Sequence, residues 1–98
     1  PLKPYVWGVQ PEIEQELNQQ AGRSDIGVTF TPHLIPMTRG ELVTCHVRGD
    51  VDQIQAALEA KYADAPFITV LPLGAPPPDT RHVRCTNNGR IAVYPDRV

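Results

Sequence analysis

One stretch, residues 29–40, constrains the fold of this chain more than any other. It reads T-F-T-P-H-L-I-P-M-T-R-G and joins an alternating apolar run at residues 26–31 to a second one at residues 42–47. Pro32 and Pro36 each lack an N–H group and have a fixed φ, so no paired strand can run through both. The sequence therefore predicts two strands connected by an irregular loop.

This loop is also the first candidate binding site. Connections held between rigid elements often carry binding side chains, and here the loop presents His33 and Arg39, which suit an anionic ligand. Thr38 and Gly40 would shape the loop around them. The alternative is a proline-stiffened connection with a surface arginine, and residue types alone favour this alternative, since such connections are common.

The bulk properties limit the chain further. Its 98 residues are enough for one domain, residues 1–98, with a modest core, and its formal net charge is −2. A nearly balanced charge gives no reason to expect a nucleic-acid partner, and no apolar run is long enough to span a membrane. Cys45 and Cys85 both fall at apolar strand positions, which favours buried thiols over a disulfide.

The remaining patterns place the other elements. We expect a strand at residues 5–9, a helix at residues 11–21 that starts at Pro11 and stops at Gly22, and a second helix after Asp50 that ends before Pro66. A strand at residues 67–71 should precede a final hairpin, residues 82–86 and 90–94, turning at Asn88-Gly89. The predicted class is α+β, in the order β-α-β-β-α-β-β-β, with a largely antiparallel sheet and both helices on one of its faces.

Other candidate sites are weaker. Glu12 and Glu16 form a solvated helix face more readily than an acid–base pair. His46 has no second His or Cys at the spacing of metal ligands, so no metal site is predicted. The prolines at residues 76–78 suit a spacer better than a polyproline ligand. Glycine-rich nucleotide loops and nucleophile elbows are absent, so these residues do not complete an active site.

Several blocks nevertheless resemble one enzyme family. Residues 29–40 resemble the signature loop of N-acetyl-gamma-glutamyl-phosphate reductases. Residues 11–17, residues 62–67 with Leu71-Pro72, and residues 80–84 with residues 93–98 are similar to further blocks of that family, in the same order. The resemblance implies the substrate domain of a two-domain, NADP-dependent enzyme of arginine biosynthesis that reduces an acyl phosphate to the semialdehyde through a cysteine thioester.

The resemblance carries expectations about site and partners. It implies that His33, Thr38, Arg39 and Gly40 contact a small anionic acyl-phosphate substrate, that Asn87 contacts NADP, and that the domain associates with itself through its sheet. It also implies a cytoplasmic protein or one of the plastid stroma. A guanidinium can grip a carboxylate or phosphate with two parallel hydrogen bonds, which suits Arg39.

The departures limit what the chain can do alone. The family's P-G-C-Y-P-T-like cysteine segment and its H-R-H run are absent, and Cys85 to Gly89 replaces a G-S-N-Y-C-like stretch in which only Asn87 matches. We therefore expect no catalytic residue, no bound NADP and no turnover in this chain by itself. The start at Pro1 and the stop after a strand suggest a piece of a longer protein. A non-catalytic assembly module and an engineered scaffold are the alternatives.

Overall fold

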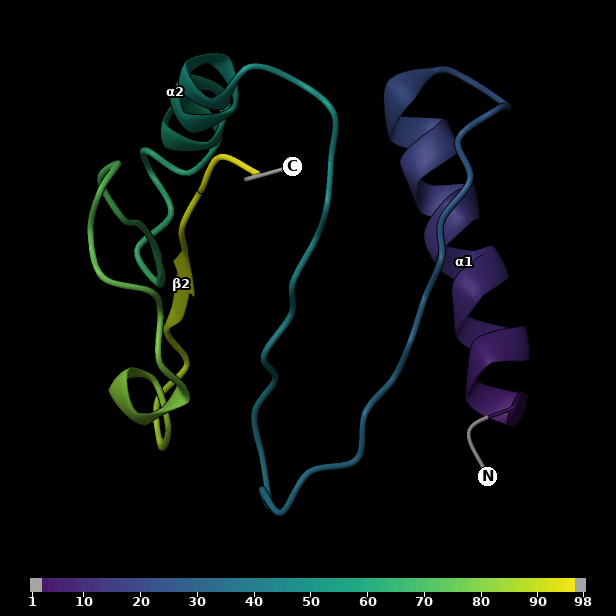
Figure 1. Cartoon of the computed structure of the whole chain (residues 1–98), viewed down its shortest axis with the longest axis horizontal. Coiled ribbons are helices and arrows are strands. Elements are labelled where there is room, and N and C mark those ends of the chain that lie inside the picture. Colours follow the sequence, from purple (N-terminus) through teal and green to yellow (C-terminus); the bar gives the residue numbers. More distant parts are fainter. Residues whose placement is uncertain (1–2, 97–98) are drawn as a thin grey trace. The chain divides into compact units, whose positions relative to one another are not determined.

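The computed structural model describes residues 3–96 and divides into two compact units, one up to Pro36 and one from Met37 onward (Figure 1). The first unit contains α1, Lys3–Ala21. The second contains α2 (Val51–Lys61), β1 (Ile68–Val70), a short 3-10 helix η1 (Thr80–His82) and β2 (Gly89–Ile91). The α+β class is confirmed. Because α1 and α2 belong to different units, the placement of both helices on one face of a sheet stays a prediction.

Helix α1 begins earlier than the sequence indicates. The predicted strand at residues 5–9 is wrong, because these residues form the first turns of α1, and Pro11 lies inside the helix instead of opening it. A strand needs a neighbour for its hydrogen bonds, whereas a helix satisfies most of its own, so the segment is helical here. The helix ends as predicted at Gly22, whose φ of +64° is the left-handed conformation that suits glycine.

The face of α1 that is covered is more polar than the spacing of Ile13, Leu17 and Ala21, four residues apart, predicts. Leu17 is 44% exposed and Ala21 is exposed. Ile13 is half-buried, and so are three polar residues spaced four apart, Gln10, Glu14 and Asn18.

These polar side chains bind the extended segment at residues 26–30, which runs beside α1 in Figure 1. The backbone N–H groups of alternate residues donate to them: Ile26 to Asn18 Oδ1 (2.9 Å), Val28 to Glu14 Oε1 (3.0 Å) and Phe30 to Gln10 Oε1 (3.3 Å). Four residues of helix rise about 6 Å. Two residues of strand advance about 6.6 Å, so the spacings match. We call this set of contacts the side-chain ladder.

In the second unit, α2 follows the sequence prediction closely. The N-cap Asp50 accepts a hydrogen bond from the Gln53 N–H at 3.0 Å, and the helix ends before Pro66. The helical spacing of its apolar residues predicts one apolar stripe, and the residues of this stripe are half-buried: Val51, Ile54, Leu58 and Tyr62.

The sheet differs from the prediction. Within residues 3–96 it has two strands, β1 and β2, which are parallel, with Ile68 opposite Gly89 and Val70 opposite Ile91. The strand at residues 67–71 is confirmed, but the largely antiparallel sheet is wrong.

The predicted Asn88-Gly89 hairpin is wrong as well. Residues 80–82 form η1, and the Gly89 N–H donates to Phe67 O at 2.8 Å, so this glycine opens β2. A Cβ at Gly89 would lie 3.1 Å from Ile68 Cδ1, so the glycine allows the strands to approach closely.

A buried glutamine joins α2 to the strand end. Gln55 is 5% exposed, and its Nε2 donates to Leu71 O (2.9 Å) and to Glu59 Oε1 (2.7 Å). Its Oε1 is buried without a partner. Leu71 in turn donates its N–H to Ile91 O at 2.8 Å. Gln55 therefore ties the helix to the paired strands through a polar contact that the apolar stripe does not predict.

The described part of the chain has no closed core. Among residues 8–96 no apolar side chain is buried, and several large ones are well exposed. Cys45 and Cys85 are free and exposed, so the prediction of buried thiols is wrong. The prediction rested on their alternation with polar residues, but no other described element covers either side chain. Apolar surface of this kind is usually covered by another element or another chain.

Candidate functional site

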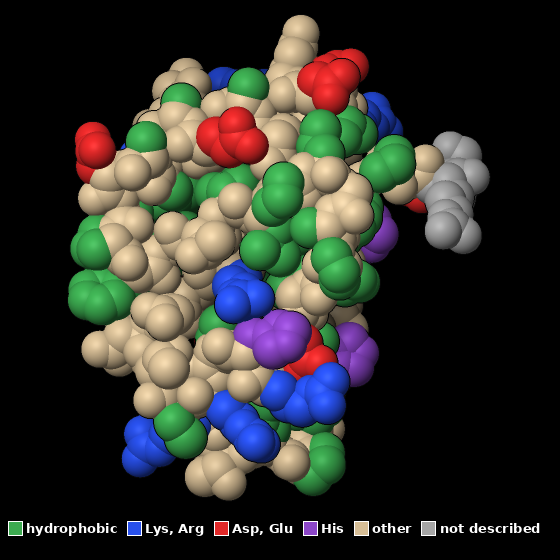
Figure 2. Space-filling model, turned by 90° about the vertical axis from the view of Figure 1, so that its left-hand side faces the viewer, with side chains coloured by type: hydrophobic (Ala, Val, Ile, Leu, Met, Phe, Trp, Pro, Cys, Tyr) green, Lys and Arg blue, Asp and Glu red, His purple; other side chains and the backbone are tan. Residues whose placement is uncertain are grey.

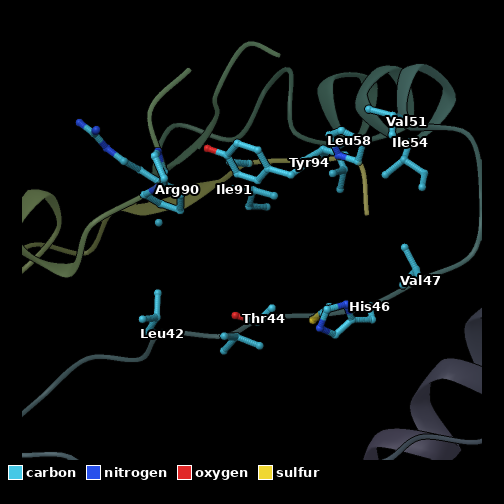
Figure 3. A pocket seen from close by; sticks show the side chains of 18 of the residues that line it. Leu42, Thr44, His46, Val47, Val51, Ile54, Leu58, Arg90, Ile91 and Tyr94 are labelled. Carbon is cyan, nitrogen blue, oxygen red and sulfur yellow. The ribbon is translucent and has the colours of Figure 1, made fainter. Parts of the chain in front are cut away.

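The second unit contains an open groove of about 1330 Å³. One wall is the extended segment at residues 41–47, and the other combines the apolar stripe of α2 with residues 88–96. In Figure 3, Leu42 and Val47 from the first wall and Ile54 and Ile91 from the second point into the gap. We call it the apolar groove.

The first wall of the groove consists of residues predicted to form a strand. Residues 42–47 are extended and exposed, with Leu42 64%, Val43 69% and Val47 70% accessible. The predicted strand is therefore wrong in one respect: no described strand pairs with this backbone. The physical reason is that alternation makes a segment extended and amphipathic, whereas pairing requires a second edge within reach.

The chemistry of the groove favours association over catalysis. Small-molecule sites usually have about 300–1,000 Å³ and a few convergent polar groups. This groove is larger and open, and its polar side chains, such as Thr44 and His46, are spread along one wall. Within residues 3–96, no group of three His, Cys, Asp or Glu side chains is arranged to hold a metal ion. None of the helices described has the length and hydropathy needed to cross a bilayer.

The predicted anion-binding residues lie in the connection between the units. His33 is exposed and belongs to the first unit, whereas Thr38, Arg39 and Gly40 belong to the second. Residues 31–41 form neither helix nor strand, as the two prolines predict. Gly40 has a φ of +102°, a conformation that favours glycine. The pairing of His33 with Arg39 stays a prediction.

Asn87, the predicted cofactor contact, lies in an irregular loop before β2 and is exposed. This loop turns sharply: Cys85 has a φ of 63°, the Thr86 hydroxyl donates to Val83 O, and the Asn88 N–H donates to Thr86 Oγ1 at 3.1 Å. A single exposed amide does not form a nucleotide cradle, so these residues by themselves do not fit NADP.

Upstream of this loop, an ion pair holds η1. Asp79 caps η1 by accepting the Arg81 N–H at 2.8 Å, and it also accepts from Arg81 Nε (3.0 Å) and Nη2 (2.6 Å). These side-chain hydrogen bonds lower the pKa of Asp79 to about 2. In the first unit, Arg23 likewise lowers the pKa of Asp25 through a two-pronged contact.

Comparison with known proteins gives this geometry a context. Residues 9–98 match the family described as semialdehyde dehydrogenase, dimerisation domain. The chain belongs to this family. None of the solved structures matches it.

Relatives identify the branch that this dimerisation domain resembles. An N-acetyl-gamma-glutamyl-phosphate reductase of Ruegeria pomeroyi is 49% identical over 87 residues, which cover 89% of this chain and 25% of that protein. The enzyme of the same name from Alkalilimnicola ehrlichii is 51% identical over 85% of the chain and 24% of its own length. That from Brevibacillus brevis is 48% identical over 89% and 26%. The chain thus spans about a quarter of these curated relatives, and the resemblance drawn from its sequence blocks is confirmed.

Sequence reasoning missed the apolar groove of this dimerisation domain and the buried Gln55. One wall of the groove had a visible signal, because residues 42–47 alternate as a strand does. Gln55 had none, since it lies on α2 beside the apolar stripe and only the fold brings Leu71 to its amide.

Proposed function

We propose that this chain is the self-association part of an NADP-dependent N-acetyl-gamma-glutamyl-phosphate reductase, and that a second copy covers the apolar groove. The observation that carries the proposal is the exposed apolar wall at residues 42–47, found in a chain of the dimerisation-domain family. The groove gives a partner a continuous, mostly apolar surface in the second unit.

The side chains of the wall supply the first argument. Leu42, Val43 and Val47 are each more than 60% exposed, and burying an aliphatic side chain is worth about 1.5–3 kcal/mol. A two-fold pair buries the same residues on both copies, so each apolar contact is counted twice. The wall therefore provides a large part of the driving force that a dimer needs.

The backbone of the wall supplies the second argument. An extended segment without a strand partner presents a row of N–H and C=O groups, and a strand from another chain can pair with such an edge. Residues 42–47 have this form in the described structure. A second copy would satisfy these groups and cover the side chains at the same time.

The mass of the chain in solution tests the proposal. Sedimentation velocity over a range of concentrations should show a species of twice the 10.8 kDa chain mass that dissociates on dilution. A chain that sediments only as a monomer at every concentration would overturn the proposal. An assembly whose size grows without limit would also overturn it, since a two-fold contact closes.

The reductase chemistry belongs to the whole enzyme in this proposal. The chain has neither the cysteine segment nor the histidine run of the resembled family, and Asn87 alone does not fit NADP. We expect no consumption of NADPH when the chain is mixed with NADPH and N-acetyl-glutamyl phosphate, measured by the absorbance of the reduced nicotinamide. Turnover above the uncatalysed rate would show that this chain is a complete enzyme.

A second proposed role is contact with the substrate through the loop. His33 and Arg39 would hold its phosphate or carboxylate, while Thr38 and Gly40 shape the backbone; the φ of +102° at Gly40 supports the second part. Binding of the acyl-phosphate analogue N-acetylglutamate should weaken about tenfold in Arg39→Gln, as expected for the loss of charged hydrogen bonds. The matched control Arg48→Gln, also exposed, should bind as the unchanged chain does.

A further inference from the structure

A second histidine–arginine pair lies in the second unit, on η1 and β2. Arg90 is the middle residue of β2, and His82 is the last residue of η1. Arg90 Nη1 lies 3.5 Å from His82 Nδ1, and both side chains are exposed. Arg90 belongs to the second wall of the apolar groove, and in Figure 3 its side chain extends away from the wall formed by residues 42–47.

The contact determines which atoms remain available. A guanidinium is always a donor and never an acceptor, so Nδ1 of His82 must accept and the ring proton of the neutral imidazole must lie on Nε2. The pair then presents the other N–H groups of Arg90 and the Nε2–H of His82 to solvent. All of these are donors, which suits a ligand that only accepts hydrogen bonds.

The charged residues near the pair in the sequence are Arg81, Arg84 and the Asp79 carboxylate, and Asp79 interacts electrostatically with His82. Arg84 lies between the two residues in the sequence, and Arg81 is engaged by Asp79 on η1. Among residues 3–96, no carboxylate pairs with Arg84 or Arg90. Figure 2 shows Lys, Arg and His side chains gathered in the lower half of the face turned to the viewer, with an acidic side chain among them. Because Asp79 is engaged by Arg81, the positive charge of Arg84 and Arg90 is left for a ligand to balance.

We propose that His82 and Arg90 form a binding site for a phosphate group, either inorganic phosphate or the phosphate of a small phosphomonoester. Arg90 would hold two oxygens through its free N–H groups, and the Nε2–H of His82 would hold a third. Arg84 would add long-range attraction. Tetrahedral oxyanions offer several acceptors on one small group, which matches donors that converge from a strand and a helical turn.

The three histidines of the chain provide the readout. Imidazole ring signals are followed by long-range ¹H–¹⁵N NMR while inorganic phosphate, and separately glycerol phosphate, replaces chloride at constant ionic strength. Before phosphate is added, we expect the His82 ring to show the Nε2–H tautomer. Its ring signals should then shift saturably with both phosphates, while the ring signals of His46 stay unchanged. A saturable response to inorganic phosphate alone would restrict the ligand to the free ion, still at this site.

Variants separate this site from general charge and from the loop. Arg90→Gln should weaken the phosphate affinity read from the His82 signals about tenfold. Arg90→Lys should weaken this affinity less, because the charge stays although the two-pronged geometry is lost. Arg48→Gln removes the same charge at an exposed position and should change the phosphate affinity read from His82 less than about twofold. Arg39→Gln should affect only His33, so failure of one anion site is distinguishable from failure of the other.

Two results would overturn the proposal. One is the absence of a saturable His82 shift over the millimolar range in the unchanged chain. The other is equal weakening by Arg90→Gln and Arg48→Gln, which would show screening by surface charge. The amide signals of Leu71 and Ile91 show whether Arg90→Gln keeps the β1–β2 pairing.

Discussion

Two extended segments of this chain carry the same sequence signal and have different surroundings. Residues 26–30 and residues 42–47 both alternate apolar and polar side chains. In the first, the N–H groups of three alternate residues are bound by the side-chain ladder of α1. In the second, every residue is exposed, and within residues 3–96 no strand pairs with the backbone.

The difference shows that an alternating apolar and polar pattern makes a segment extended. Whether its backbone is paired depends on which hydrogen-bonding groups lie beside it. A strand-like segment must satisfy its backbone groups, and the first segment satisfies the N–H groups of Ile26, Val28 and Phe30 locally, with amide and carboxylate oxygens of one helix. The second has no such helix face beside it, because the stripe that α2 turns to the groove is apolar. We therefore regard the first segment as complete within one chain and the second as open to a second copy.

Placing a charge in the open segment should have the largest effect. Val43→Asp would require a carboxylate to be desolvated in an apolar contact, and we expect self-association to weaken about a hundredfold in sedimentation velocity. Leu73→Asp is the control, since Leu73 is 44% exposed and lies outside the groove. Equal weakening by both substitutions would contradict a contact centred on residues 42–47.

Removing the end of the side-chain ladder should have a smaller and local effect. The Asn18 side chain makes three hydrogen bonds: Nδ2 donates to Glu14 O (2.8 Å) and Ile26 O (3.1 Å), and Oδ1 accepts the Ile26 N–H (2.9 Å). Asn18→Ala should lower the free energy of local opening at Ile26 by about 1–2 kcal/mol, measured by amide hydrogen exchange. Gln19→Ala, an exposed neighbour on α1, should leave it unchanged. Unaltered protection of Ile26 in Asn18→Ala would show that the ladder is not what orders this segment.

A change at the centre of the ladder should be smaller again. Glu14 contributes one contact, the Val28 N–H at 3.0 Å, so Glu14→Ala should reduce the opening free energy at Val28 by about 1 kcal/mol. Glu16→Ala, exposed on the same helix, is the matched control. Amide exchange at residues 42–47 should respond to neither; a response there would contradict the independence of the two segments.

The smallest expected effect concerns the pH dependence of the second unit. The pKa of Asp79 is lowered to about 2 from an ordinary value of 3.8 by its hydrogen bonds with Arg81. The stabilisation from this pair is therefore present above pH 3.8 and is lost as the pH falls from there to about 2. Carbon-detected NMR should give a midpoint near the lower value, and Arg81→Gln should return it toward the higher one. A midpoint unaffected by Arg81→Gln would rule out this cause.

The sequence predicted local structure better than pairing. Asp50 and the apolar stripe located α2, and Gly22 located the end of α1, because caps and periodicity act within one element. The Asn88-Gly89 signal failed because the Gly89 N–H has a partner in Phe67, more than twenty residues away. Pro11 failed as a helix start because residues 3–10 have no strand beside them and continue the helix.

The same distinction applies to the sites. The alternating pattern indicated an amphipathic segment at residues 42–47, but only the structure shows that its apolar side chains line a groove. Likewise, His82 and Arg90 are eight residues apart in the sequence, and the chain turns at Cys85 between them before it enters β2. Residue types do not predict this turn, so they did not predict the contact.

Amide hydrogen exchange at two protein concentrations tests the central claim most directly. We predict that Ile26, Val28 and Phe30 are protected to the same extent at both, because the side-chain ladder lies within one chain. Residues 42–47 should exchange freely in the dilute monomer and become protected in the concentrated sample, where a second copy covers them. Free exchange of residues 42–47 at both concentrations, together with a dimer in the same sample, would contradict the account.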